Sequence, residues 1–148
     1  MRLRYAYVVR CTGVDKDLAG NVVTVHCEYD PDTRSGTPGA DRKKVKGNIH
    51  WLSARRARQS EVRLYDRLFL NANPGAGDRD FRGDLNPDSK QVITAYLEPA
   101  LTDARPEDRF QFERHGYFVA DRVDTRAGAP VFNRAVTLRD TWGKKPTG

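Results

Sequence analysis

Apolar and polar residues alternate along most of this chain, which is the pattern of half-buried β-strands. In RLRYAYVVR (2–10), leucine, tyrosine and valine side chains share one face and arginines occupy the other. The same alternation recurs in NVVTVHCEY (21–29), and the intervening DKDLAGN (15–21) supplies the Asp, Gly and Asn that a hairpin connection needs. The pattern therefore predicts two strands that pair directly with each other.

Further strand patterns follow at intervals of roughly ten residues. The expected strands are 46–53, 61–70, 91–99, 109–122 and 130–142, with Gly116 and Gly128 placed where a bend or turn is easy. Two long segments between strands, 30–44 and 71–89, are rich in Pro, Gly and Asp and are predicted loops, the second with one helical turn around 81–85. Short strands broken by such turns indicate an all-β protein, built as an antiparallel barrel or a pair of barrels.

One of these strands, FQFERHGYF (110–118), has an unusual polar face. Phe110 and Phe112 point to one side of an extended segment and are predicted core residues, which leaves Gln111 and Glu113 on the other side. These polar side chains have defined hydrogen-bonding geometry. The polar side of the segment is therefore either an ordinary solvated surface or a surface that recognises a ligand.

The net charge of +6 is distributed unevenly along the chain. Residues 1–60 carry +6, residues 61–120 carry −3, and residues 121–148 carry +3. If the two basic ends meet in one barrel, they form a single positive face that suits a polyanion. The alternative is that the charge serves only solubility, and composition does not decide between the two.

The cysteines and histidines do not suggest a catalytic or metal site. Cys11 and Cys27 fall within alternating apolar segments, so we expect packed, reduced thiols of a cytosolic protein, with a disulfide as the alternative. His26, His50 and His115 lie far apart and form no metal-ligand or nucleophile pattern. No apolar run approaches the ~20 residues that span a membrane. A free-standing enzyme is therefore the weaker interpretation.

Six stretches of the chain carry a family resemblance. They are VRCTGVDKD, VHCEYDPDTRSGTPGADRKKVKGNIHWLSA, EVRLYDRLF, LNPDSK, FQFERHGYF and PVFNRAVTLRDTW. In order and spacing they resemble the C-terminal anticodon-binding region of the glutaminyl-tRNA synthetases. The most specific part is KVKGNIHW followed by EVRLYDRLF, and the similarity extends through essentially the whole chain.

The resemblance implies a fold of two antiparallel β-barrels, proximal and distal, of the ribosomal-protein-like anticodon-binding type. It implies that residues 1–50 form the first part of the proximal barrel, 51–114 the distal barrel, and 115–148 the returning strands that complete the proximal barrel. The family's proximal barrel begins some tens of residues earlier. We therefore expect a proximal barrel that lacks its first strands, together with the upstream groups for the third anticodon base.

The resemblance also places anticodon contacts on this chain. The matched positions are Arg2, Arg4, Arg139 and Thr141 for the first anticodon base, and Gln111 and Arg114 for the middle uridine. A glutamine amide offers an acceptor and donors that match the edge of uracil. A general phosphate-attracting role is expected for the basic cluster Arg42, Lys43, Lys44 and Lys46. Without the resemblance, exposed arginines of this kind would be read as solubilising residues.

The function implied by the resemblance is recognition of the glutamine anticodon, CUG or UUG, by the RNA-binding part of a cytoplasmic glutamine–tRNA ligase. The expected partners are the anticodon loop of tRNA(Gln) and the catalytic domain of the same enzyme, with no membrane or DNA partner. The class I catalytic signatures are missing from this chain, so ATP and Mg are expected only in the catalytic domain of the full-length enzyme, and no cofactor, metal or catalytic residue is expected here. The alternatives are a structural, ribosomal-type RNA-binding barrel and a protein-docking module.

Trp51 and Trp142 could stack on bases, but in their strand contexts they are predicted to be core residues.

Overall fold

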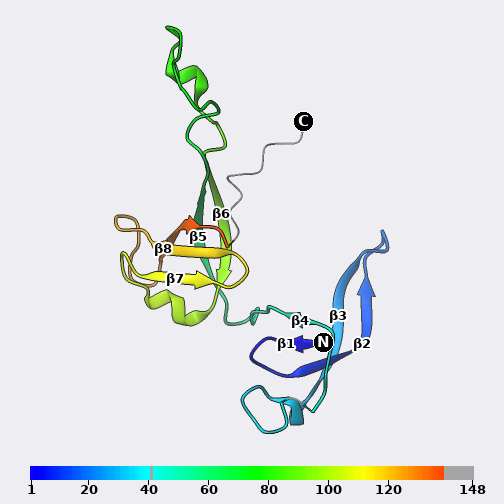
Figure 1. Ribbon diagram of the computed structural model, residues 1–148. Coiled ribbons are helices and arrows are strands. Elements are labelled where there is room, and N and C mark those ends of the chain that lie inside the picture. Colours follow the sequence, from blue (N-terminus) through cyan, green and yellow to red (C-terminus); the bar gives the residue numbers. More distant parts are fainter. Residues whose placement is uncertain (41, 139–148) are drawn as a thin grey trace. The chain divides into compact units, whose positions relative to one another are not determined.

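The protein is described by a computed structural model for residues 1–40 and 42–138. The chain divides after Trp51 into two compact units, and each contains one β-sheet (Figure 1). The elements of the described residues are β-strands and short 3₁₀ turns, which confirms the all-β class. Neither sheet closes into a barrel in these ranges. None of the helices in the described ranges has the length and apolar character that crossing a membrane requires.

The first unit is a four-stranded sheet with the order β3-β2-β1-β4. Its strands are β1 (Arg2–Leu3), β2 (Val8–Lys16), β3 (Val22–Asp30) and β4 (Asn48–Ile49), and the 3₁₀ turn η1 (Pro31–Thr33) follows β3. Strands β2 and β3 form the predicted hairpin, and its turn is held by Asp17, whose carboxylate accepts from the backbone N–H of Ala19 and of Asn21 at 2.9 Å each. The parallel pairing of β1 with β4 departs from the antiparallel prediction.

The segment 2–10 is not one continuous strand, so that prediction is wrong. Tyr5 adopts a left-handed φ of 58°, and the chain turns around it: the N–H of Leu3 donates to the carbonyl of Tyr7, and the N–H of Ala6 donates to the carbonyl of Leu3, both at 2.9 Å. Arg2 and Arg4 therefore belong to β1 and the following turn. They do not share a continuous strand face with the residues of β2.

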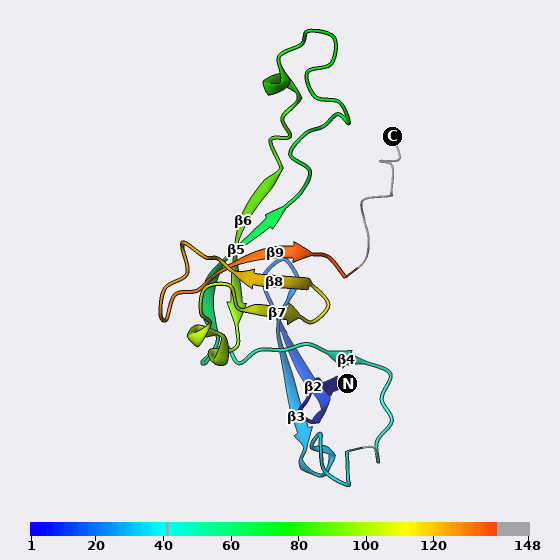
Figure 2. The same ribbon diagram turned by 60° about the vertical axis from the view of Figure 1, so that its left-hand side comes forward.

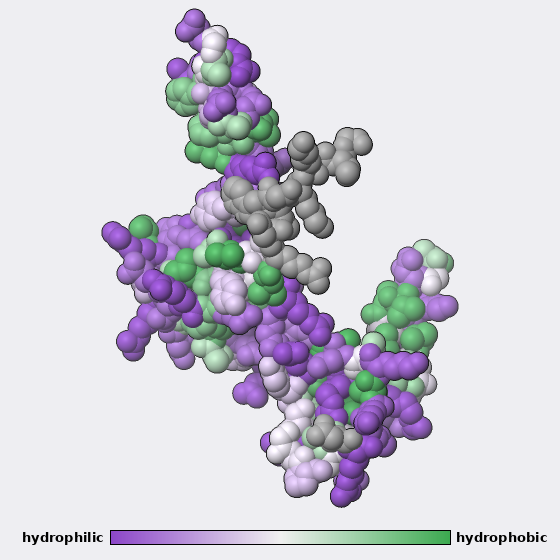
Figure 3. All heavy atoms as spheres, in the orientation of Figure 1, coloured by the Kyte–Doolittle hydropathy of each residue, from purple (hydrophilic) through white to green (hydrophobic). Residues whose placement is uncertain are grey.

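The core of the first unit is small. Thr33 is buried, its hydroxyl accepts from the N–H of the buried Val8 at 2.9 Å, and it donates to the carbonyl of Asp30 at 2.7 Å. The β2–β3 hairpin, in contrast, leaves apolar side chains exposed, as the green spheres along it show (Figure 3). Cys11 and Cys27 are both exposed and reduced. The prediction that these thiols are packed is therefore wrong.

The second unit is a five-stranded sheet with the order β6-β5-β9-β8-β7. Its strands are β5 (Arg58–Tyr65), β6 (Lys90–Leu97), β7 (Arg109–Phe112), β8 (Gly116–Ala120) and β9 (Val131–Val136), and its 3₁₀ turns are η2 (Phe81–Asp84) and η3 (Pro99–Asp103). Strands β7, β8 and β9 lie side by side in antiparallel pairs (Figure 2), whereas β5 and β9 are parallel. Strands on both sides of the boundary predicted at 114/115 thus belong to one sheet. The return of 115–148 to the first barrel stays a prediction.

Aromatic side chains build the core of the second unit. Phe132 is fully buried, at 0% exposure. The rings of Phe112 and Phe118 stack with their centroids 4.4 Å apart, and Phe110 meets Phe132 edge to face at 5.7 Å. Such pairs add stabilisation beyond the apolar area that they bury. The prediction that Phe110 and Phe112 are core residues is confirmed.

The segment between β5 and β6 is an ordered excursion organised by Asp84. This buried carboxylate accepts from the backbone N–H of Gly75 at 2.9 Å and from the side-chain amide of Asn71 at 2.5 Å. The two bonds favour the charged form and keep the pKa of Asp84 below its ordinary value. A bridge between Phe69 and Leu85 closes the base of the excursion. The turn η2 confirms the helical turn predicted near 81–85.

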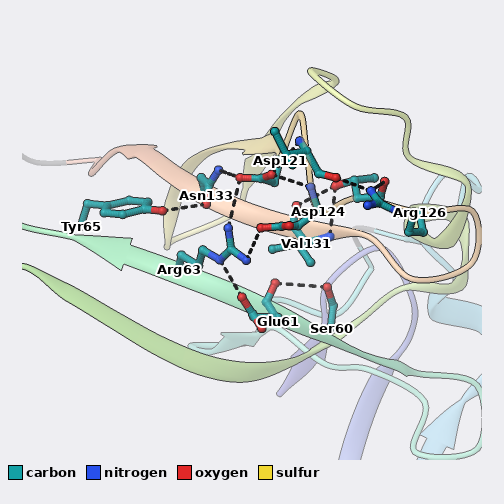
Figure 4. Close-up of polar contacts among 11 residues, drawn as sticks. Ser60, Glu61, Arg63, Tyr65, Asp121, Asp124, Arg126, Val131 and Asn133 are labelled. Carbon is teal, nitrogen blue, oxygen red and sulfur yellow. Dashed lines mark hydrogen bonds and ion pairs between the residues drawn. The ribbon is translucent and has the colours of Figure 1, made fainter.

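A polar network on the sheet is centred on Arg63, whose side chain is only 15% exposed. Figure 4 shows its guanidinium directed toward three carboxylates: it lies 2.6 Å from Glu61, 3.2 Å from Asp121 and 2.6 Å from Asp124. Asn133 on β9 donates to Asp121 at 2.6 Å. The network joins β5, β9 and the connection between β8 and β9. Through these ion pairs, Arg63 stabilises the contacts between these parts of the sheet.

Acid is expected to weaken this network through Asp121. The amide of Asn133, then the backbone N–H groups of Asp124 and Val123, and the nearby Arg63 guanidinium lower the pKa of Asp121 from 3.8 to about 2. Because the pKa of Asp121 is lower in the folded state than in the unfolded state, its contribution to stability is complete above the unfolded pKa. That contribution is lost as the pH falls through the folded pKa. We expect a loss of about 2 kcal/mol from this group between about pH 5 and about pH 2.

Urea unfolding at a series of pH values measures this loss, with Asp121→Asn as the comparison. The variant lacks the titrating carboxylate, so its free energy of unfolding should fall less steeply over the same acid range. Parallel curves for the two proteins would show that Asp121 does not carry the effect.

Candidate nucleic-acid interface

The segment FQFERHGYF folds as the β7–β8 hairpin, so 109–122 is not one uninterrupted strand, and the turn lies directly before Gly116, where a bend was expected. The N–H of His115 donates to the carbonyl of Phe112 at 2.9 Å, which closes the turn. Arg114 has a left-handed φ of 66°, and Gly116 has a φ of 140°. Glu113 and Arg114 consequently lie in the turn, and only Gln111 retains the predicted place on a strand face.

Gln111 lies directly opposite Tyr117 across the hairpin. Directly opposed residues of antiparallel strands project from the same face of the sheet. Both side chains are exposed, and the exposed fraction of Tyr117 is 49%. On the other side of β8, Tyr117 pairs with Val136 of β9, which is also exposed. An exposed ring can stack on an unpaired base, and a neighbouring amide can pair with the edge of that base. The hairpin thus offers both elements of single-stranded base recognition.

Sequence reasoning missed Tyr117. The signal was Gly116, which follows the polar residues and can take the backbone conformation of a tight hairpin. A turn placed there brings Tyr117 opposite Gln111, whereas a continuous strand carries it away.

The side chain of Arg2 is hydrogen-bonded to the segment that follows β3. Its guanidinium donates to the carbonyl of Thr33 at 2.9 Å, to the hydroxyl of Ser35 at 3.5 Å and, through a short contact, to the carbonyl of Ala40. The side chain is half-buried in this position. Arg2 therefore shapes the loop, and contact with an anticodon base stays a prediction for it.

Arg4 lies beside the exposed ring of Tyr5. The guanidinium carbon is 4.9 Å from the ring centroid, and a guanidinium N–H donates to the Tyr5 hydroxyl at 3.2 Å. The indole N–H of Trp51 donates to the carbonyl of Arg4 at 3.0 Å, and the Trp51 side chain is 44% exposed. The core prediction for Trp51 is wrong. This corner of the first unit presents a cation and two aromatic rings.

All four residues of the basic cluster are exposed, but one of them forms an ion pair with a carboxylate. Arg42, Lys44 and Lys46 are exposed. Lys43 is also exposed, but its ammonium forms an ion pair with Asp30. That hydrogen bond is the main reason why the pKa of Asp30 lies below its ordinary value. Lys43 is thus less available to a phosphate than the other three.

The residues predicted to contact the anticodon belong to different units of the chain. Arg2, Arg4 and the basic cluster belong to the first unit, and Gln111 and Arg114 belong to the second. Arg139, Thr141 and Trp142 lie outside the described residues. In the ranges 1–40 and 42–138, no three His, Cys, Asp or Glu side chains are grouped as a metal ion would require.

Comparison with known families assigns the chain to a class. A family model described as "tRNA synthetases class I (E and Q), anti-codon binding domain" matches residues 48–121, a range that includes Gln111, Arg114 and Tyr117. The chain belongs to this family of anticodon-binding domains.

The chain is similar to particular members over nearly its whole length. It is 69% identical to the glutamine–tRNA ligase of Cupriavidus metallidurans and 65% identical to that of Ralstonia nicotianae, in each case over 97% of this chain and 25% of the relative. Identity to the glutamine–tRNA ligase of Nitrosomonas europaea is 60%, over 97% of this chain and 26% of the relative. The chain thus spans about a quarter of the length of the curated relatives that it matches.

Proposed function

We propose that this chain is the anticodon-reading part of a glutamine–tRNA ligase, and that it binds the anticodon loop of a glutamine tRNA. The observation that carries the proposal is the 69% identity to a glutamine–tRNA ligase over 97% of this chain. The exposed pair of Gln111 and Tyr117 supports it, because it combines an amide with an aromatic ring. In the full-length enzyme, a separate catalytic domain attaches glutamine to the tRNA with ATP and Mg.

The middle uridine is assigned to the β7–β8 hairpin. Tyr117 stacks on the base, and the amide of Gln111 pairs with the donor and acceptor on the edge of uracil. Arg114, exposed in the adjoining turn, neutralises a neighbouring phosphate. The first anticodon base is assigned to Arg4 and its aromatic neighbours, and the assignments of Arg2, Arg139 and Thr141 to that base are retained from the family resemblance.

A footprint on the tRNA tests where the chain binds. A glutamine tRNA transcript is probed by chemical cleavage with and without the 148-residue chain. Protection confined to the anticodon loop and adjoining stem is expected. Protection spread over all helices of the tRNA would support a structural RNA-binding barrel in its place, and the absence of protection at low salt would support a protein-docking module.

Tyr117→Ala is expected to weaken binding to the glutamine tRNA by about tenfold or more, because a base stacked on an aromatic ring contributes about 1–3 kcal/mol. Tyr117→Phe keeps the ring and should bind nearly as well as the unchanged chain. Fluorescence anisotropy with labelled tRNA measures both. Equal losses for the two variants would show that the hydroxyl, and not stacking, makes the contact.

The basic cluster is expected to control the salt dependence of binding. Replacing Lys44 and Lys46 by alanine should weaken binding to all tRNAs alike and reduce the slope of log affinity against log salt by about 1 for each phosphate that is no longer neutralised. Lys43→Ala is the matched control, and it should change the slope less because Lys43 is paired with Asp30. A larger change for Lys43→Ala than for the double variant would contradict this assignment.

A further inference from the structure

The β2–β3 hairpin carries two thiols opposite each other. Cys11 of β2 is in register with Cys27 of β3, both are reduced, and both are exposed. As direct cross-strand neighbours, their side chains project from the same face of the hairpin. The Cys11 thiol donates to the carbonyl of Gly13 at 3.6 Å, and neither thiol belongs to the proposed RNA contacts.

The hydrogen-bond pattern defines which kind of cross-strand pair they form. The N–H of Val9 donates to the carbonyl of Met1 at 2.7 Å, and the carbonyl of Val9 accepts from the Met1 amino group at 3.0 Å. The peptide groups of Val9 thus point away from β3, and those of Cys11, two residues later, follow the same alternation. Cys11 and Cys27 therefore form a non-hydrogen-bonded pair.

This kind of pair suits a disulfide. In a non-hydrogen-bonded pair the two Cα atoms lie about 4.5 Å apart, and the side chains are closer together than in a hydrogen-bonded pair. Disulfides are formed at Cα separations of about 4.4–6.8 Å. The register then shifts between Cys11 and Gly13, which makes Thr12 a bulge residue. A bulge locally bends and twists its strand, so a small adjustment there does not have to disturb the whole ladder.

We propose that Cys11 and Cys27 are a reversible oxidation site that a peroxide converts to an intramolecular disulfide. One thiolate attacks the peroxide oxygen, which gives a sulfenic acid and releases the other oxygen as water. The second sulfur attacks the sulfenic sulfur, the S–S bond forms, and a second water leaves. Two thiols and one hydrogen peroxide thus give one disulfide and two waters, and a dithiol reductant restores the thiols.

The disulfide links the two strands of an arm whose apolar face is exposed. The cross-link lies beyond the ion pair of Arg10 with Glu28, at 2.8 Å, and before the hydrogen bond between His26 and Asp15, at 2.8 Å. Oxidation thus turns a strand pair held by hydrogen bonds and the Arg10–Glu28 ion pair into a covalently closed hairpin. Opening of the hairpin is suppressed in the oxidised form and returns on reduction.

The experiment treats the 148-residue chain with hydrogen peroxide and measures intact mass and the number of alkylatable thiols after unfolding. The expected product is a monomer about 2 Da lighter, since two hydrogens are lost, with both thiols blocked and both recovered by dithiothreitol. Hydrogen exchange of the β3 amides should be slower in this product than in the reduced chain.

Cys11→Ser and Cys27→Ser are the controls, and neither should give the lighter monomer or the slower exchange. Products about 16 Da heavier for each oxidised sulfur, without the lighter species, would overturn the proposal. Disulfide-linked dimers as the main product would also overturn it. These readouts contain no RNA, so their outcome is independent of anticodon binding.

Discussion

Gly116→Ala is expected to lower the free energy of unfolding by about 3 kcal/mol, the upper end of the cost of a strained backbone residue. Gly116 has a φ of 140°, which side-chain-bearing residues rarely adopt. A Cβ at this position would also lie 2.4 Å from the carbonyl oxygen of Val136, a backbone atom of the adjacent strand. The β8–β9 pairing would have to move to accommodate a methyl group.

Urea unfolding of the two proteins measures this loss, and Gly83→Ala is the matched control. A Cβ at Gly83 meets nothing within 4 Å, and Gly83 lies in the turn η2 without a positive φ. The control should therefore stay close to the parent in stability. If both alanines were equally destabilising, neither the close approach at Val136 nor the backbone of Gly116 would be the cause.

Gln111→Ala is expected to lower the preference for uridine at the middle anticodon position by about tenfold, with a smaller loss of affinity for RNA in general. A base that cannot satisfy the amide leaves polar groups unmatched at about 1–3 kcal/mol for each lost bond, and about 1.4 kcal/mol is a tenfold change. Removing the amide removes that penalty. The measurement is the ratio of dissociation constants for tRNAs that differ only in the middle base.

The same sheet contains a matched control for Gln111. Gln59 on β5 lies opposite Tyr96 on β6, and its amide donates to the Tyr96 hydroxyl at 2.9 Å. Gln59→Ala therefore removes an exposed strand glutamine beside a tyrosine, but at another place on the sheet. It should leave the base preference unchanged. Equal losses of preference from the two variants, or a uniform loss of affinity from Gln111→Ala, would contradict the assignment of Gln111.

The parts of the fold that depend on local signals could be predicted from the sequence. DKDLAGN indicated the hairpin, and its Asp17 makes the turn contacts. Alternation placed Phe110 and Phe112 in the core. Alternation alone did not reveal turns inside apolar segments, at Tyr5 and at Arg114, where positive φ values reverse the chain. The same errors placed Arg2 and Arg4 on one continuous strand face and hid Tyr117.

Other features depend on residues that are distant in the sequence. Arg63 meets Asp121 across 58 positions, and a charged residue in a strand gives no sign of its partner. The parallel pairings of β1 with β4 and of β5 with β9 likewise need the folded chain. Burial of Cys11 and Cys27 was expected from their apolar neighbours, yet several apolar residues of the hairpin, such as Val25 and Tyr29 beside Cys27, are themselves exposed. Periodicity predicts which residues share a face, and it does not predict whether another element covers that face.

The most direct test of the central claim is an exchange of anticodons between two tRNA bodies. The CUG anticodon is placed in a tRNA of another amino-acid specificity, and the glutamine tRNA receives the anticodon of that other tRNA. Affinity for the 148-residue chain is then measured for all four transcripts. Anticodon reading predicts that tight binding follows CUG into the foreign body and falls by at least about tenfold in the altered glutamine tRNA. Binding that stays with the glutamine tRNA body, whatever its anticodon, would contradict it.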